Sequence, residues 1–180
     1  MRFALISDIH SNADALARVL EDIDRKKIDR IFCLGDIVGY GPDPEFCVDK
    51  VRERCEFSLL GNHEHGAMFY ASDFNPRARA AIDWTRDQLS RRDCPREENT
   101  RFWNYLDSMK KEHREGHMLF VHGSPRDPVR EYLVPRDVTD KQKMDLVMTV
   151  GQYTQVSMML NSFGVQLDPG QELDPALDHR

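Results

Sequence analysis

Residues that can ligate a metal ion recur at four places in the sequence, each directly after an apolar run. They are Asp8 and His10, Asp36, Asn62 and His63, and His122. Carboxylate, imidazole and amide donors in one set suit Mn, Fe, Zn or Ni better than Ca or Mg, which favour pure oxygen cages. None of the four cysteines falls at such a position, so a structural thiolate zinc site is not expected. The sequence predicts a metal centre with mixed nitrogen and oxygen ligands.

Two ions would make sense of this composition. The Asp36 carboxylate has two oxygens and can bridge ions about 3.5–4 Å apart, which shields their mutual repulsion. Asp8 and His10 would then hold one ion, and Asn62 and His122 the other. Water between two such ions loses a proton near neutral pH and becomes a nucleophile. The chemistry expected of this constellation is hydrolysis.

Each residue also has an ordinary structural explanation when it is taken alone. Asp8 can cap backbone N–H groups in a turn, and Gly-Asp, as at Asp36, often ends a strand. Asn62 tolerates a tight turn, and His122 can be a half-buried histidine with satisfied hydrogen bonds. His63, beside Asn62, could stay off the metals and face a substrate. The metal hypothesis therefore rests on all of them meeting at one place.

Alternating strand and helix signals position these residues. Continuous apolar runs predict strands at 3–6, 30–34, 56–60 and 117–121. Helical spacing predicts helices at 13–23 after a Ser11 or Asn12 cap, and at 44–54, 76–91 and 96–111. This alternation is typical of an α/β sheet that is parallel at least at its start. Ligands of such sheets gather beyond the carboxyl ends of the strands, where the metal-ligating residues stand.

Four segments carry a resemblance to a known family. They are Asp8 to His10, Gly35 to Pro42, Gly61 to Glu64, and Val121 to Gly123. Their order and spacing resemble the calcineurin-like metallophosphoesterase superfamily, and within it the small prokaryotic phosphodiesterases, over about residues 1–140. The resemblance implies an α/β fold built as a two-sheet β-sandwich flanked by helices.

The resemblance also implies roles for single residues. The metal ligands would be Asp8 and His10 for the first ion, Asp36 as the bridge, and Asn62 and His122 for the second ion. His63 would polarise the scissile phosphate or protonate the leaving oxygen, and Glu64, in place of the more usual Asp, would orient a neighbour. The implied reaction is hydrolysis of a phosphodiester by a hydroxide that bridges two divalent ions, Mn above Fe, Zn or Ni. The substrate would be a small-molecule or nucleotide phosphate ester.

The family's last motif, Gly-His-x-His, has no counterpart after His122. Where it would fall, within residues 147–156, the chain carries Gln152 and Gln155 after a glycine. An amide oxygen binds transition metals less tightly than an imidazole, so both ions would be held more weakly. The alternative to the enzyme is therefore a degenerate or truncated non-catalytic relative with weak metal or nucleotide binding.

The same departure affects the expected architecture. Strands of the second sheet normally follow the missing motif, so an incomplete second sheet is expected. It would leave an edge or an apolar face that a homo-oligomer could cover. The domain prediction is one phosphoesterase domain over residues 1–167, with residues 168–180 as a disordered tail.

Composition narrows the class of protein. The 180 residues suit a single domain with a core of its own. With 25 basic and 31 acidic residues, the net charge of -6 shows no footprint for nucleic acid. No apolar stretch approaches the length of about 18 residues that a membrane span needs. The cysteines form no CxxC pair, which favours reduced thiols and a cytoplasmic location.

Overall fold

The computed structural model describes residues 2–133 and begins with a parallel sheet. Its strands lie in the order β1 (Phe3–Ile6), β2 (Arg30–Cys33) and β3 (Phe57–Ser58). The register pairs Leu5 with Phe32, and Phe32 with Phe57. The predicted parallel start of the sheet is confirmed, and the carboxyl ends of all three strands meet at one edge.

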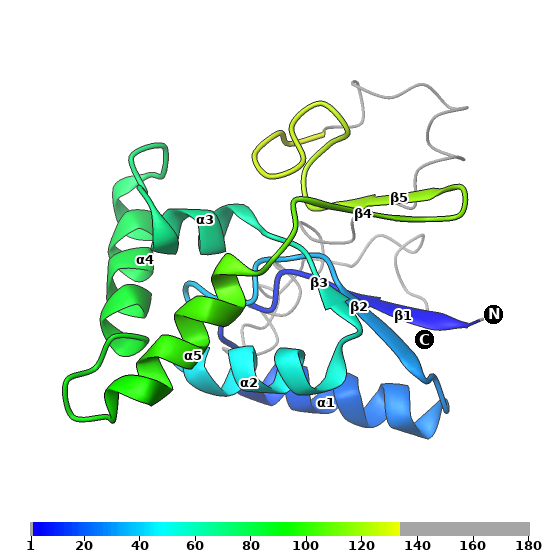
Figure 1. Cartoon of the computed structure of the whole chain (residues 1–180), viewed down its shortest axis with the longest axis horizontal. Coiled ribbons are helices and arrows are strands. Elements are labelled where there is room, and N and C mark those ends of the chain that lie inside the picture. The colour runs from blue at the N-terminus through cyan, green and yellow to red at the C-terminus, as the bar shows by residue number, and fades with distance from the viewer. Residues whose placement is uncertain (1, 134–180) are drawn as a thin grey trace, which may run out of the picture.

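Two helices connect these strands, α1 (Ala13–Arg25) and α2 (Pro44–Arg54). The Asn12 side chain accepts the Ala15 N–H at 3.0 Å, so the predicted cap of α1 is confirmed. Each helix turns its apolar face to the sheet, and Figure 1 shows both on the same side of it.

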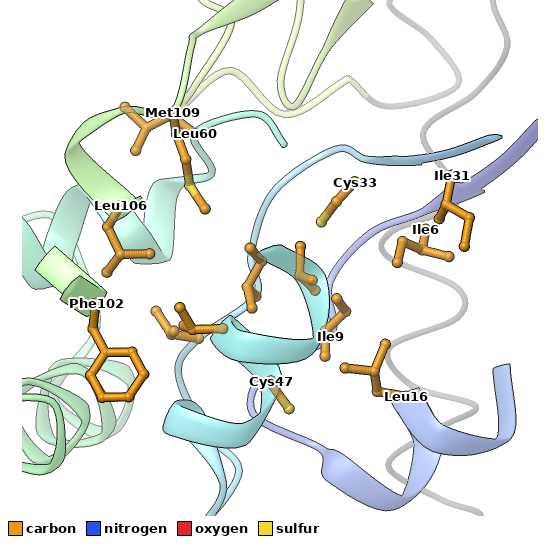
Figure 2. Close-up of a cluster of buried hydrophobic side chains, with 14 of the residues drawn as sticks. Ile6, Ile9, Leu16, Ile31, Cys33, Cys47, Leu60, Phe102, Leu106 and Met109 are labelled. Carbon is orange, nitrogen blue, oxygen red and sulfur yellow. The ribbon is translucent and has the colours of Figure 1, made fainter. Parts of the chain in front are cut away.

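The main core lies between the sheet and the helices. Figure 2 shows Leu16 of α1, Cys33 of β2 and Cys47 of α2 in one cluster with Phe102 and Leu106. The last two residues come from α5 (Arg96–Asp107), which completes this layer beside α3 (Asn62–Met68) and α4 (Pro76–Gln88). All four cysteines are free thiols, as expected.

A second, smaller sheet covers the other face of the parallel sheet. Strands β4 (Glu112–Glu115) and β5 (Met118–Val121) pair antiparallel. Between the two sheets, the Phe32 ring stacks on Phe3 and Phe57 at centroid distances of 4.9 and 4.5 Å. Phe120 of β5 meets Phe32 edge-on at 5.5 Å. The predicted α/β fold with two sheets, the second one small, is confirmed.

Several predicted boundaries were wrong. The helix predicted at 96–111 ends at Asp107, and β4 begins at Glu112. Strand β4 has no apolar run that would predict a strand. It is a strand because it pairs with β5. Helix α3 was not predicted, the strand predicted at 56–60 is reduced to Phe57–Ser58, and the helix predicted at 76–91 ends at Gln88.

Two predictions reach outside the described residues. Nothing in residues 2–133 tests the end of the domain at residue 167 or the tail at 168–180. Within the described part of the chain, no helix is both long and apolar enough to cross a membrane.

Candidate metal centre

The loops that follow β1 and β2 are held against each other in an unusual backbone conformation. Asp8, His10 and Asp36 all have positive φ, at 52°, 49° and 54°. The Asp8 N–H donates to the Gly35 carbonyl at 3.0 Å, and the His10 N–H donates to the Asp36 carbonyl at 2.9 Å. Left-handed backbone costs about 1–3 kcal/mol at a residue other than glycine, and such residues cluster at functional sites. Three of the predicted ligands therefore stand on strained, tightly coupled loops.

Two imidazoles converge on one oxygen of Asp36. The Asp36 Oδ2 lies 3.7 Å from His10 Nε2 and 3.5 Å from His122 Nε2. Asp8 Oδ1 lies 3.8 Å from the same nitrogen of His10. The Asp36 Oδ1 accepts the backbone N–H of His63 at 2.9 Å, which fixes the carboxylate in this orientation.

The hydrogen bonds of these imidazoles leave the right nitrogen for a metal. His10 Nδ1 lies 3.1 Å from the Val38 carbonyl, and His122 Nδ1 lies 2.9 Å from the Leu34 carbonyl. A carbonyl oxygen only accepts, so both Nδ1 atoms carry a proton. In the neutral ring, the lone pair is then on Nε2, which faces Asp36.

Asn62, the first residue of α3, meets His122 at close range. Its Oδ1 is 3.0 Å from His122 Nε2. In the neutral ring two lone pairs face each other, which a shared cation would relieve, whereas a protonated His122 donates its Nε2–H to Asn62 Oδ1. Burial opposes protonation of His122, but the carboxylates of Asp36, Asp8 and Glu64 outweigh it and raise the pKa of the ring. The pair is a ready pair of ligands for a positive ion.

Asp36 is deeply buried, with 3% of its surface exposed. Burial raises the pKa of its carboxyl group to about 8; the charge of His122 opposes this shift, and the Glu64 and Asp8 carboxylates add to it. A protonated His122, 3.5 Å away, therefore compensates the buried carboxylate only in part. This carboxylate, together with Asn62 Oδ1 and His122 Nε2, is a set of donors that fits a divalent cation.

Glu64 joins the two loops that carry Asp36 and Asn62. It is fully buried, and its Oε2 accepts the backbone N–H groups of Asp36 at 2.8 Å and Gly61 at 3.0 Å. Its Oε1 accepts the Val38 N–H at 3.0 Å. The expectation that Glu64 orients a neighbour agrees with these bonds. The full set of bonds could not be foreseen, because two of the three partners are backbone N–H groups 26 and 28 residues away.

His63 is enclosed by other rings and is 3% exposed. Its ring centroid lies 4.5 Å from that of His10, 4.7 Å from Tyr40 and 5.1 Å from Phe74. Its Nδ1 is buried without a hydrogen-bond partner. Burial, and then the charges of His10 and His122, lower the pKa of His63 to about 2. The ring is therefore neutral over the physiological range.

The structure brings all six sequence-predicted site residues together. A tighter subset consists of His10, Asp36 and His63, whose ligand atoms lie within 4.8 Å of one another. His63, predicted to stay off the metals, is thus also close enough to share an ion. Gln152 and Gln155, the expected substitutes for the missing histidines, lie outside the described residues. Sequence analysis missed Tyr40, whose ring lies 4.9 Å from that of His10, although it stands inside the Gly35–Pro42 motif.

Comparisons with known proteins found a matching family model and similar chains. The family model described as calcineurin-like phosphoesterase matches residues 1–165. An uncharacterized protein from Methanocaldococcus jannaschii is 41% identical over 141 residues, which cover 76% of this chain and 56% of that protein. The crystal structure of a metallophosphoesterase from Sphaerobacter thermophilus is similar with a TM-score of 0.58 and 41% identity, over 74% of this chain and 51% of the other. The chain thus spans about half the length of these relatives.

Replacing Glu64 with Gln tests the bridge between the loops. The amide oxygen can still accept hydrogen bonds, but the amide N–H₂ would face a backbone N–H and leave it unsatisfied. We expect Glu64→Gln to lower the free energy of unfolding by about 1–3 kcal/mol, measured by urea denaturation. Glu53→Gln, on exposed surface, is the control and should cost less than about 1 kcal/mol. Equal losses in the two variants would contradict the role of Glu64.

Gly39 sets the position of the His63 ring. A Cβ at Gly39 would lie 2.2 Å from His63 Nδ1, whereas one at Gly116 would meet nothing within 4 Å. Both glycines have positive φ, at 95° and 59°, so alanine strains the backbone at either position. We expect Gly39→Ala to destabilise the protein by about 1–3 kcal/mol more than Gly116→Ala. NMR of the His63 ring should also report its displacement in Gly39→Ala alone. An unmoved ring and equal stability would refute the prediction.

Proposed function

The chain belongs to the calcineurin-like phosphoesterase family, and on that premise we propose that it is a metal-dependent phosphoesterase that hydrolyses phosphodiesters. The observation that carries the proposal is the Asp36 Oδ2, which lies within 3.7 Å of His10 Nε2 and 3.5 Å of His122 Nε2. One carboxylate oxygen between two imidazole lone pairs is what a carboxylate that bridges two ions requires. Asp36 thus lies between the two sets of donors, close to His10 on one side and to His122 on the other.

The donors divide into two groups around Asp36. Asp8 and His10 would hold one divalent ion, Asn62 and His122 the other, and Asp36 both. The chemistry that bound ions supply here is the acidification of a water molecule and the neutralisation of charge on the phosphoryl oxygens. Mixed nitrogen and oxygen ligands favour Mn, with Fe, Zn or Ni as the other choices.

His63 would act on the substrate and not on the ions. Its Nδ1 is buried against the backbone of Gly39, so Nε2 is the nitrogen that can contact a phosphate ester. The low pKa keeps the ring neutral, with one N–H to donate. A hydrogen bond from that N–H to a phosphoryl oxygen, or to the leaving oxygen, would stabilise charge that develops in the transition state.

Removal of the bridging carboxylate should abolish both metal pairing and activity. We expect wild-type protein dialysed against Mn to bind about two ions per chain and to hydrolyse bis-p-nitrophenyl phosphate. Asp36→Ala should lower that turnover at least about 100-fold, since metal ions supply several kcal/mol of transition-state stabilisation. Asp83→Ala, on exposed surface, is the matched control and should change neither quantity.

Metal analysis of these samples distinguishes the alternative. One ion or none in folded wild-type protein, without turnover, would favour a degenerate, non-catalytic relative. Near wild-type turnover in Asp36→Ala would show that the bridging role is wrong.

His63→Ala separates a substrate contact from a metal ligand. We expect the variant to keep its Mn content and to lose turnover by about 10²- to 10⁴-fold, the usual contribution of a positioned proton donor. Isothermal titration with Mn measures the ions, and bis-p-nitrophenyl phosphate measures the turnover. Loss of one ion in His63→Ala would instead make His63 a ligand, together with His10 and Asp36.

A further inference from the structure

A tight turn beside the metal centre holds one aromatic side chain in a strained conformation. Gly39 and Tyr40 have φ of 95° and 59°, and the Gly41 N–H donates to the His10 carbonyl at 2.9 Å. A Cβ at Gly41 would lie 2.4 Å from that carbonyl oxygen, and one at Gly39 would overlap the His63 ring. Because the two glycines have no side chains, the turn can lie directly against the site. Tyr40, between them, is the residue that carries a side chain.

The Tyr40 ring lies over two residues of the site. Its centroid is 4.9 Å from that of His10 and 4.7 Å from that of His63, in edge-on and tilted arrangements. It is 47% exposed, so much of the phenol remains open to solvent. Its hydroxyl has no hydrogen-bond partner among residues 2–133. Burial and hydrogen bonding therefore do little to offset a left-handed backbone that costs about 1–3 kcal/mol at such a residue.

We propose that Tyr40 is a specificity-determining residue that stacks on the planar group of a phosphate ester bearing an aromatic or heterocyclic substituent. The inference rests on the proposed function, because the ester phosphate must occupy the site around Asp36. An aromatic ring gains most from another flat ring in an offset stack. A ring fixed beside His10 and His63, with much of its surface open, provides that partner for a group attached to the bound phosphate.

Two non-hydrolysable anions test this contact without relying on turnover. Phenylphosphonate and methylphosphonate share the same anionic group and differ in the planar ring, and cyclohexylphosphonate adds an apolar ring that is not flat. We expect calorimetric titration of the Mn-supplemented protein to give phenylphosphonate a Kd about 2- to 12-fold lower than either of the others. Tyr40→Phe should keep this preference, because the ring remains, and Tyr40→Leu should remove it.

The matched control is Tyr70→Leu, which removes an 80% exposed tyrosine and should keep the preference. Retention of the preference in Tyr40→Leu would overturn the inference, as would its loss in Tyr40→Phe. Equal affinity of the three anions in wild-type protein would overturn it and leave the proposed function standing. No binding of any anion in the presence of Mn would overturn both.

A measurement on wild-type protein keeps the inference falsifiable if Tyr40→Leu fails to fold. With ¹³C-labelled tyrosine rings and Zn in place of Mn, phenylphosphonate should shift the Tyr40 ring resonance, and methylphosphonate should shift it much less. An unmoved Tyr40 resonance at saturating phenylphosphonate would overturn the stacking contact.

Discussion

The buried carboxylate of Glu64 is the interaction on which the site depends. It accepts the N–H groups of Asp36, Val38 and Gly61 and so ties the loop after β2 to the start of α3. Burial raises the pKa of Glu64, and these three bonds stabilise its charged form in return. Without these three hydrogen bonds, Asp36 and Asn62 would stand on two independent loops.

The site combines costs that a folded protein ordinarily avoids. Asp8, His10, Asp36 and Tyr40 have left-handed backbones, and Asp36 is a buried carboxyl whose pKa is raised to about 8. Asn62 Oδ1 faces His122 Nε2 across 3.0 Å. Divalent cations would offset the cost of the buried carboxylate by neutralising it, and Asn62 Oδ1 and His122 Nε2 are both placed to bind such an ion. The strained backbone thus holds the donor atoms in position before a ligand binds.

The proximity of the metal-ligating residues could be predicted from the sequence better than the helices and strands around them. Asp8 and Asp36 follow apolar strands, and the carboxyl ends of neighbouring parallel strands coincide, so their proximity follows from topology alone. Strand β4 could not be predicted, because Glu112–Glu115 is polar and exists as a strand only through its pairing with β5. Nor could the left-handed backbone of Tyr40, since its turn is packed against His10 and His63, which come from distant parts of the sequence. His122 reaches the site from the second sheet, held by the Leu34 carbonyl of the first.

Anomalous diffraction from crystals soaked in Mn would show whether Asp36 bridges two ions. We expect two anomalous peaks about 3.5–4 Å apart, on either side of the Asp36 carboxylate, one beside Asp8 and His10 and the other beside Asn62 and His122. A single peak among His10, Asp36 and His63, or no peak in a well-ordered site, would contradict it.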